Sequence, residues 1–163
     1  MPQLTGRPEV FHIASSDEDT SQQIPLGTRA SDVNGNEYVY LRGTASVVAG
    51  DWCQIFYADF TVARTGADVV GQLGIAGTAI GATEFGWFQI YGRSTIANIA
   101  TGAGQGVGSG PLALYLTSTA GRAGTADVAG DLIEGAFILG GIAAGNVGTA
   151  WLTYPATYNV AQD

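Results

Sequence analysis

Short apolar runs separated by glycine-containing turns, among them Asn34-Gly35 and Gly50-Asp51, make up most of the chain after Asp32. Both residues of an Asn-Gly turn tolerate the positive φ angles that a tight hairpin needs. No stretch long enough for a helix shows a convincing 3.6-residue apolar period. This pattern predicts an all-β fold, either an antiparallel β-sandwich or a small barrel.

Seven segments are expected to be strands, with turn residues between them. The segment from Trp52 to Val62 is expected to be a single strand, because its even-numbered positions are largely apolar. The expected strands cover residues 37–41, 52–62, 69–75, 85–96, 112–117, 136–139 and 149–154.

The expected strand over residues 85–96 has two different faces. Alternation places Phe88, Ile90 and Ile96 together on one face. The opposite face is a candidate interface, because Trp, Tyr and Arg are enriched at protein–protein hot spots. Its residues are Trp87, Gln89, Tyr91 and Arg93. The sequence is equally compatible with a second sheet of the same chain covering this face.

Residues 1–30 are expected to form an extended N-terminal arm, and residues 31–163 a β-rich domain. The arm has few apolar side chains, too few to offset the entropy lost on ordering its backbone. We therefore expect it to become ordered against a partner. The candidate contact residues of the arm are Leu4, Val10, Phe11, His12 and Ile13.

Reactive side chains are scarce in this chain. It has one His, one Cys and no Lys, whereas most hydrolytic and transfer chemistry at neutral pH uses one of these or a carboxylate pair. Cys53 lies among apolar neighbours and is expected to be a buried, unreactive thiol. The sequence therefore predicts a protein that acts through surface contact and not an enzyme.

Charge and hydropathy argue against two classes of partner. The formal net charge is −8 and the Arg residues are dispersed, so no basic patch for nucleic acid is expected. No apolar stretch approaches the ~20 residues of a membrane-spanning helix. The first residues lack the pattern of a signal peptide, which predicts synthesis in the cytoplasm without secretion by that route.

Three motifs are expected to be loops or turns, with no metal and no cofactor. Residues 102–110 are rich in Gly but lack the Lys of a P-loop and the glycine spacing of a dinucleotide site. Residues 32–37 resemble the start of a calcium loop, but Gly and Glu miss the positions that an EF-hand requires. Asp127, Asp131 and Glu134 are close enough in sequence to share a cation, but a solvated loop is the favoured interpretation.

A short internal similarity links Ile80–Gly86 with Ile142–Gly148. Each segment has an apolar residue, a turn of small residues, a polar residue, an apolar residue and a Gly. Hairpins that reuse the same turn chemistry are the simpler explanation, and an internal duplication is the alternative.

Five segments together resemble a known family. Leu26-Gly27-Thr28 precedes a hairpin that ends in Glu37-Tyr38-Val39-Tyr40, and Ala49-Gly50-Asp51 follows it. Val70-Gly71-Gln72-Leu73-Gly74-Ile75-Ala76 and Phe85-Gly86-Trp87-Phe88-Gln89-Ile90-Tyr91-Gly92 complete the pattern. Over roughly Leu26 to Pro155, the chain resembles the small decoration or cement proteins that bind the outside of tailed-bacteriophage heads.

This resemblance implies a β-sandwich or β-tulip domain, often trimeric, with an arm that reaches across capsid subunits and with no catalytic residues. The expected function is that of a virion structural protein that bridges major capsid protein subunits on the capsid surface. Its expected partners are the major capsid protein and further copies of itself in a homotrimer. The alternative is a carbohydrate- or receptor-binding β-module of a phage fibre or bacterial surface, in which Trp87, Tyr91 and Trp151 form a stacking platform.

Overall fold

The structure is a computed structural model that describes residues 18–100, 111–126, 131–143 and 146–158. These residues form eleven strands and no helix, so the predicted all-β fold is confirmed. Nothing within the described ranges is a helix long and apolar enough to cross a membrane. The strands are β1 (Glu18–Asp19), β2 (Arg29–Ser31), β3 (Glu37–Gly43), β4 (Trp52–Phe56), β5 (Thr61–Arg64), β6 (Gly71–Ala76), β7 (Phe85–Ala100), β8 (Leu112–Leu116), β9 (Ala123–Gly124), β10 (Leu132–Ala143) and β11 (Val147–Thr157).

Strands β3 to β6 and the first part of β7 close into a ring, here called the first ring. Strand β3 pairs antiparallel with β7 and parallel with β5, while β4 lies between β5 and β6, and β6 returns to β7. The ring closes around a buried apolar cluster that includes Val39, Ile55, Val62, Phe88 and Ile90. It is therefore a small barrel with a filled interior.

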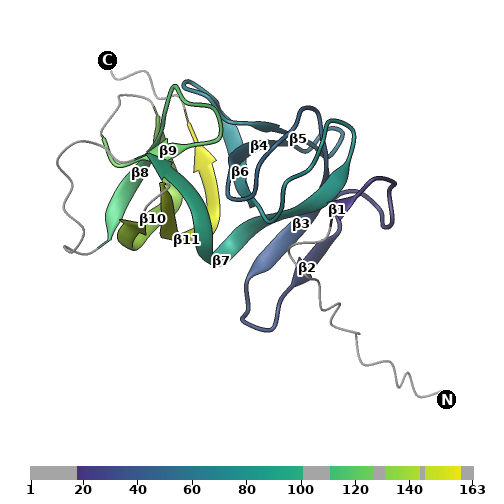
Figure 1. The fold of residues 1–163 in the computed structure, drawn as a ribbon, viewed down its shortest axis with the longest axis horizontal. Helices are drawn as coiled ribbons and strands as arrows, with labels where there is room; N and C mark the ends of the chain where they lie inside the picture. The colour runs from purple at the N-terminus through teal and green to yellow at the C-terminus, as the bar shows by residue number, and fades with distance from the viewer. Residues whose placement is uncertain (1–17, 101–110, 127–130, 144–145, 159–163) are drawn as a thin grey trace.

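The last part of β7 and strands β8 to β11 form a second ring. Strand β7 pairs antiparallel with β11 and parallel with β9, while β8 lies between β9 and β10, and β10 returns to β11. Its interior includes Ile99, Leu114, Leu116, Ile138 and Leu152. In Figure 1, β7 runs through the middle of the molecule between β8–β11 and β2–β6.

The two rings repeat the same pairing order, with β3 to β7 of the first corresponding to β7 to β11 of the second. The correspondence extends to single residues. Ile75 pairs with Gln89 in the first ring. The residues 62 positions further along the chain, Phe137 and Trp151, pair with each other in the second ring. The segments Ile80–Gly86 and Ile142–Gly148 have the same spacing and precede corresponding strands. This repeated order supports duplication as the origin of their similarity.

Most expected strands are present, but the single strand predicted over residues 52–62 is wrong. The chain reverses between Phe56 and Thr61, which pair with each other as the adjoining ends of β4 and β5. Asp59 stabilises the reversal by accepting hydrogen bonds from the backbone N–H and the hydroxyl of Thr61. The short β5 and β9, which make the two parallel pairings, were not predicted.

The prediction that Ile96 shares the buried face of Phe88 and Ile90 is also wrong. Ser94 pairs with Ala150 and Ala97 pairs with Gly148, so β7 has one residue more than β11 over this interval. Such a β-bulge reverses the alternation of the strand that contains it. Ile96 is consequently 38% exposed, whereas Phe88 and Ile90 are buried.

The described part of the predicted arm, residues 18–30, lies against the first ring. Glu18 and Asp19 pair with Gly86 and Phe85 at the start of β7. Asp19 accepts a hydrogen bond of 2.6 Å from the hydroxyl of Tyr40. Burial, together with this bond, raises the pKa of Tyr40 to about 12.

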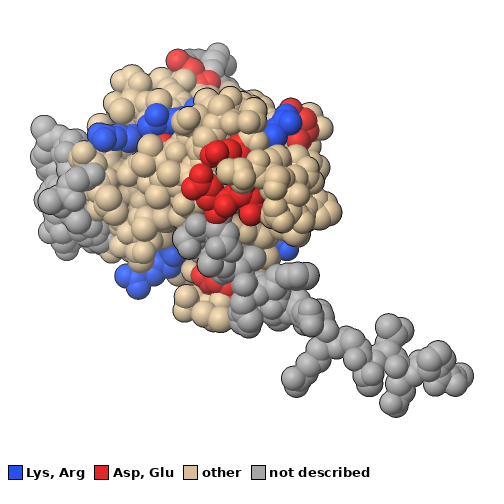
Figure 2. Space-filling view, turned by 45° about the vertical axis from the view of Figure 1, so that its right-hand side comes forward, with Lys and Arg blue, Asp and Glu red and all other residues tan. Residues whose placement is uncertain are grey.

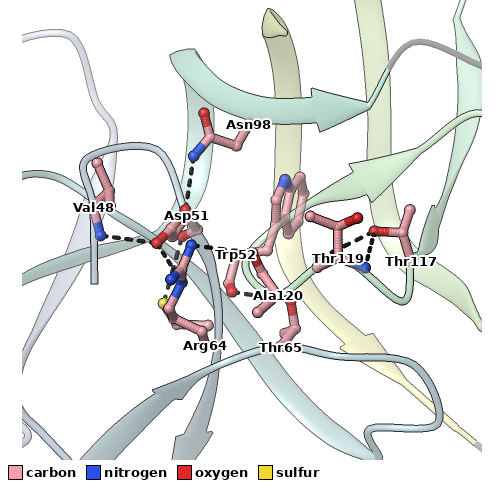
Figure 3. A network of polar contacts seen from close by, with 10 residues as sticks. Val48, Asp51, Trp52, Arg64, Thr65, Asn98, Thr117, Thr119 and Ala120 are labelled. Carbon is pink, nitrogen blue, oxygen red and sulfur yellow. Dashed lines mark hydrogen bonds and ion pairs between the residues drawn. The ribbon is translucent and has the colours of Figure 1, made fainter. Parts of the chain in front are cut away.

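A buried carboxylate joins the two rings. Asp51 accepts hydrogen bonds from the Val48 backbone N–H at 2.8 Å and from Asn98 Nδ2 at 2.7 Å, and pairs with Arg64 (Figure 3). Asn98 belongs to the part of β7 that lies in the second ring, whereas Arg64 ends β5 of the first. The neighbouring Cys53 is fully buried, and burial raises the pKa of its thiol, as expected for an unreactive residue.

Candidate contact surface

Two of the four candidate interface residues on β7 are covered by the chain itself. Trp87 is 5% exposed and Gln89 is 4% exposed. Trp87 packs in a cluster with Tyr38 and Tyr40, and the apolar residues that cover this cluster include Ile24 and Leu26. For this part of β7, the structure supports the alternative that the same chain covers the face. The arm candidates Leu4, Val10, Phe11, His12 and Ile13 lie outside the described residues.

Of the other two candidates, Tyr91 belongs to an aromatic cluster that is partly open to solvent, and Arg93 lies beside this cluster. The cluster consists of Tyr91, Trp151 and Tyr154, with Tyr91 6.3 Å from Trp151 and 5.4 Å from Tyr154 between ring centroids. Arg93 is exposed and pairs in register with Trp151. Sequence reasoning therefore found part of this surface, although β11 supplies two of its three rings.

Two charged residues, Arg29 from β2 and Glu37 from β3, contact Tyr154. The Arg29 guanidinium carbon lies 6.0 Å from the centroid of the Tyr154 ring, within the range of a cation–π contact. The Tyr154 hydroxyl donates a 2.9 Å hydrogen bond to Glu37, which raises the pKa of that hydroxyl. Neither Tyr154 nor Arg29 was a sequence candidate. Tyr154 has a φ of 55°, so its orientation does not follow the simple alternation of a strand.

A cleft of about 800 Å³ adjoins this cluster, between the β2–β3 turn and β7. It is lined on one side by the turn residues Asp32, Asn34 and Asn36, and on the other by Arg93, Ile96 and Trp151, among others. Gly92 has a φ of 93°, and the Asn36 side chain fills the space that a Cβ there would need. Asn36 Oδ1 also accepts a hydrogen bond from the Arg93 backbone N–H at 2.8 Å. The turn is thereby fixed against β7.

The calcium-loop motif forms this turn. Asp32 accepts hydrogen bonds from the backbone N–H groups of Asn34 and Asn36 and from the Asn36 side chain. Burial acts to raise the pKa of Asp32, but these bonds and one from Tyr38 outweigh it, and the net pKa is lowered. Both carboxylate oxygens of Asp32 therefore accept hydrogen bonds that hold the turn together.

Of the glycine-rich and acidic motifs, the structure describes only Asp131 and Glu134. Asp131 is buried and accepts a hydrogen bond from the Asp68 backbone N–H, while Asp127 and residues 102–110 lie outside the described residues. Among the residues described, no group of three or more His, Cys, Asp or Glu side chains is placed to hold a metal ion. Figure 2 shows a face formed mostly by uncharged residues, with small separate groups of acidic and basic atoms.

Comparison with known proteins gives no match, whether with protein-family models, with curated proteins or with solved structures.

Proposed function

We propose that this protein binds the outer surface of a phage capsid and stabilises the shell by bridging major capsid protein subunits. The observation that carries the proposal is the aromatic cluster, which presents Tyr91, Trp151 and Tyr154 on paired strands beside charged side chains. Large aromatic residues and Arg contribute most of the binding energy at many protein interfaces. The resemblance to capsid decoration proteins supports the choice of a capsid as the partner.

The paired strands keep the entropic cost of such a contact low. Tyr91 and Trp151 lie on β7 and β11, which pair along much of their length. Tyr154 is held by Glu37 and lies against Arg29. Side chains that are already oriented lose less freedom on binding. If the protein binds only the assembled shell, each occupied site stabilises that shell by RT ln(1 + [L]/Kd).

Co-sedimentation of the purified protein with expanded, empty capsids tests the proposal. Tyr154→Ala is expected to weaken binding at least tenfold, which corresponds to about 1.4 kcal/mol. Tyr57→Ala is the matched control, because Tyr57 is 38% exposed and Tyr154 is 42% exposed, but Tyr57 lies in the β4–β5 turn. Failure of the wild-type protein to sediment with capsids would contradict the function. An equal effect of both substitutions would contradict the surface.

The structure gives less support to the carbohydrate-binding alternative. Of the three residues expected to form its stacking platform, Trp87 is buried in the first ring. The planes of Tyr91 and Trp151 are inclined at 67° to each other, so these two rings do not form one flat surface. Glycan-array binding that is lost in Trp151→Ala would nevertheless favour this function over the capsid proposal.

A further inference from the structure

We infer that the cleft beside Trp151 binds a small organic carboxylate, whose negative group pairs with the Arg93 side chain and whose apolar body lies against Trp151. The inference goes beyond the proposed function, because it concerns a small ligand and needs no capsid. It is carried by a cation without a partner, a buried hydroxyl without a partner, and the position of the cleft along a strand edge.

The cleft follows an edge of β7 that no described strand covers. Four consecutive residues of this strand, from Arg93 to Ile96, line it. Successive side chains of a strand point to opposite faces, so a cleft that contacts all four lies along the strand edge. On the edge opposite β11, pairing with β3 ends at Tyr91 and pairing with β9 begins at Ile99. A ligand placed at this edge is within reach of side chains from both faces of β7.

Arg93 supplies a cation that has no carboxylate partner. Its side chain is exposed and makes no ion pair with any residue that the structure describes. Asp32 is the only acidic residue among the described ones that line the cleft, and both of its oxygens accept hydrogen bonds within the β2–β3 turn. A guanidinium offers planar N–H donors that match the two oxygens of a carboxylate. Arg93 is therefore the group that an anionic ligand would pair with in this cleft.

Ser94 adds a buried hydroxyl that has no hydrogen-bond partner. In the described part of the chain, three buried side-chain atoms lack such a partner, and they belong to Trp52, Ser94 and Thr125. Of these three residues, Ser94 is the one that lines the cleft, and it is 2% exposed. A buried polar atom without a partner is costly, and such an atom in a native structure calls for an explanation. A carboxylate oxygen would accept the hydrogen bond that the Ser94 hydroxyl can donate.

Trp151 and Ile96 give the cleft an apolar wall. Arg93 and Trp151 pair in register, so their side chains are close neighbours across the two strands. Ile96 is 38% exposed and also lines the cleft. The volume of about 800 Å³ lies within the usual range of small-molecule sites. An acid with a flat apolar body therefore fits better than a bare inorganic anion, which would leave this wall uncovered.

Titration of the full-length protein with sodium benzoate, followed by heteronuclear NMR, tests the inference without any capsid. Its failure is thereby separate from failure of the proposed function. Benzoate should shift the Arg93 Nε–H and Trp151 indole N–H signals, which are assigned by their loss in Arg93→Gln and Trp151→Phe. Benzamide has the same ring and nearly the same size but no charge, and it should bind at least about tenfold more weakly.

Two variants distinguish recognition of the carboxylate from a structural role. Arg93→Gln should weaken benzoate binding at least about tenfold, and it retains the backbone N–H that bonds to Asn36. Arg42→Gln is the matched control, because Arg42 is also exposed and makes no ion pair with described residues, but does not line the cleft. Ser94→Ala should also weaken binding about tenfold. Its thermal stability should not fall, because the hydroxyl has no partner in the free protein.

Four results would overturn the inference. Equal affinity for benzoate and benzamide would mean that the cleft recognises the ring and not the charge. Equal effects of Arg93→Gln and Arg42→Gln would mean that benzoate is attracted to cations in general. Absence of any shift at about 50 mM benzoate, where a site with a Kd near 1 mM is almost full, would mean that there is no site. Tighter binding of N-acetyl-glutamic acid amide than of benzoate would assign the cleft to an acidic side chain of a partner protein instead.

Discussion

The carboxylate of Asp51 lies 2.8 Å from Nε of Arg64, and this ion pair lies where the two rings meet. Asp51 is 1% exposed, whereas the side chain of Arg64 is partly open to solvent. The carboxylate also accepts hydrogen bonds from Val48 and Asn98 (Figure 3), so its charge is compensated from both rings. Gly121 lies directly against it, with no space for a Cβ between them.

Replacing Asp51 by Asn should therefore destabilise the whole fold. The substitution removes the charge that faces Arg64 and puts an amide group opposite N–H donors. A buried hydrogen-bonding group that loses its partner costs about 1–3 kcal/mol, and Arg64 can be solvated in part because its side chain is 37% exposed. Urea denaturation of Asp51→Asn should show this loss in the free energy of unfolding. The control is Glu134→Gln, because Glu134 is an exposed carboxylate, and it should change stability by less than about 0.5 kcal/mol.

Gly50 should not tolerate a side chain. Its φ is 86°, and a Cβ at this position would overlap the carbonyl oxygen of Ile96. Gly50→Ala is expected to cost clearly more than the ~1–2 kcal/mol of a left-handed backbone alone. Gly35→Ala separates the two effects, because Gly35 has a φ of 79° and nothing within 4 Å of the added Cβ. Equal losses of unfolding free energy in the two variants would contradict the overlap.

Replacement by Ala should mainly reduce stability at Trp87 and mainly reduce binding at Trp151. Trp87 is buried beside Tyr40 in a cluster that Ile24 and Leu26 cover, so its loss leaves a cavity and should cost about 3–5 kcal/mol. Trp151 is only partly buried, and its replacement should cost much less stability while weakening binding to capsids. Thermal unfolding and co-sedimentation with capsids, carried out on the same two samples, measure both effects. A larger stability loss for Trp151→Ala would contradict the assignment of the two faces.

Stability should fall in strongly alkaline solution through Tyr40. The pKa of Tyr40 is about 12 in the folded protein against an ordinary value of 10.0. A raised pKa means that the neutral phenol stabilises the fold, so this contribution is complete below about pH 10 and is lost as the pH approaches 12. The shift corresponds to about 2–3 kcal/mol. Tyr40→Phe cannot ionise, so its unfolding free energy should depend less on pH between about 10 and 12. Identical slopes in urea denaturation for both proteins would contradict this.

The features that could be predicted from the sequence are those set by neighbouring residues. The hairpin at Asn34-Gly35 follows from the local conformations of two residues, and it is present between β2 and β3. The exposure of Ile96 depends on a bulge that arises from pairing with β11, about fifty residues away. No local pattern could indicate it.

Contacts between residues far apart in the sequence also decide which of the candidate interface residues are exposed. Trp87 has the residue type of an interface hot spot, but Ile24 and Leu26 cover its cluster from more than sixty positions earlier in the chain. Tyr91 and Arg93 lacked such a cover and remained exposed or partly exposed. The cleft joins the β2–β3 turn to β7 and β11, and their proximity is a property of the ring topology.

Strand β7 is the final strand of one ring and the initial strand of the next, so the two repeats have a wall in common. Cutting the chain after Ala100 would leave the second barrel without its first strand, and cutting it before Phe85 would leave the first without its last. The duplicated units are therefore not modules that can be separated or exchanged. Melting of one unit would remove the support of the other, so we expect the molecule to unfold as a single thermodynamic unit.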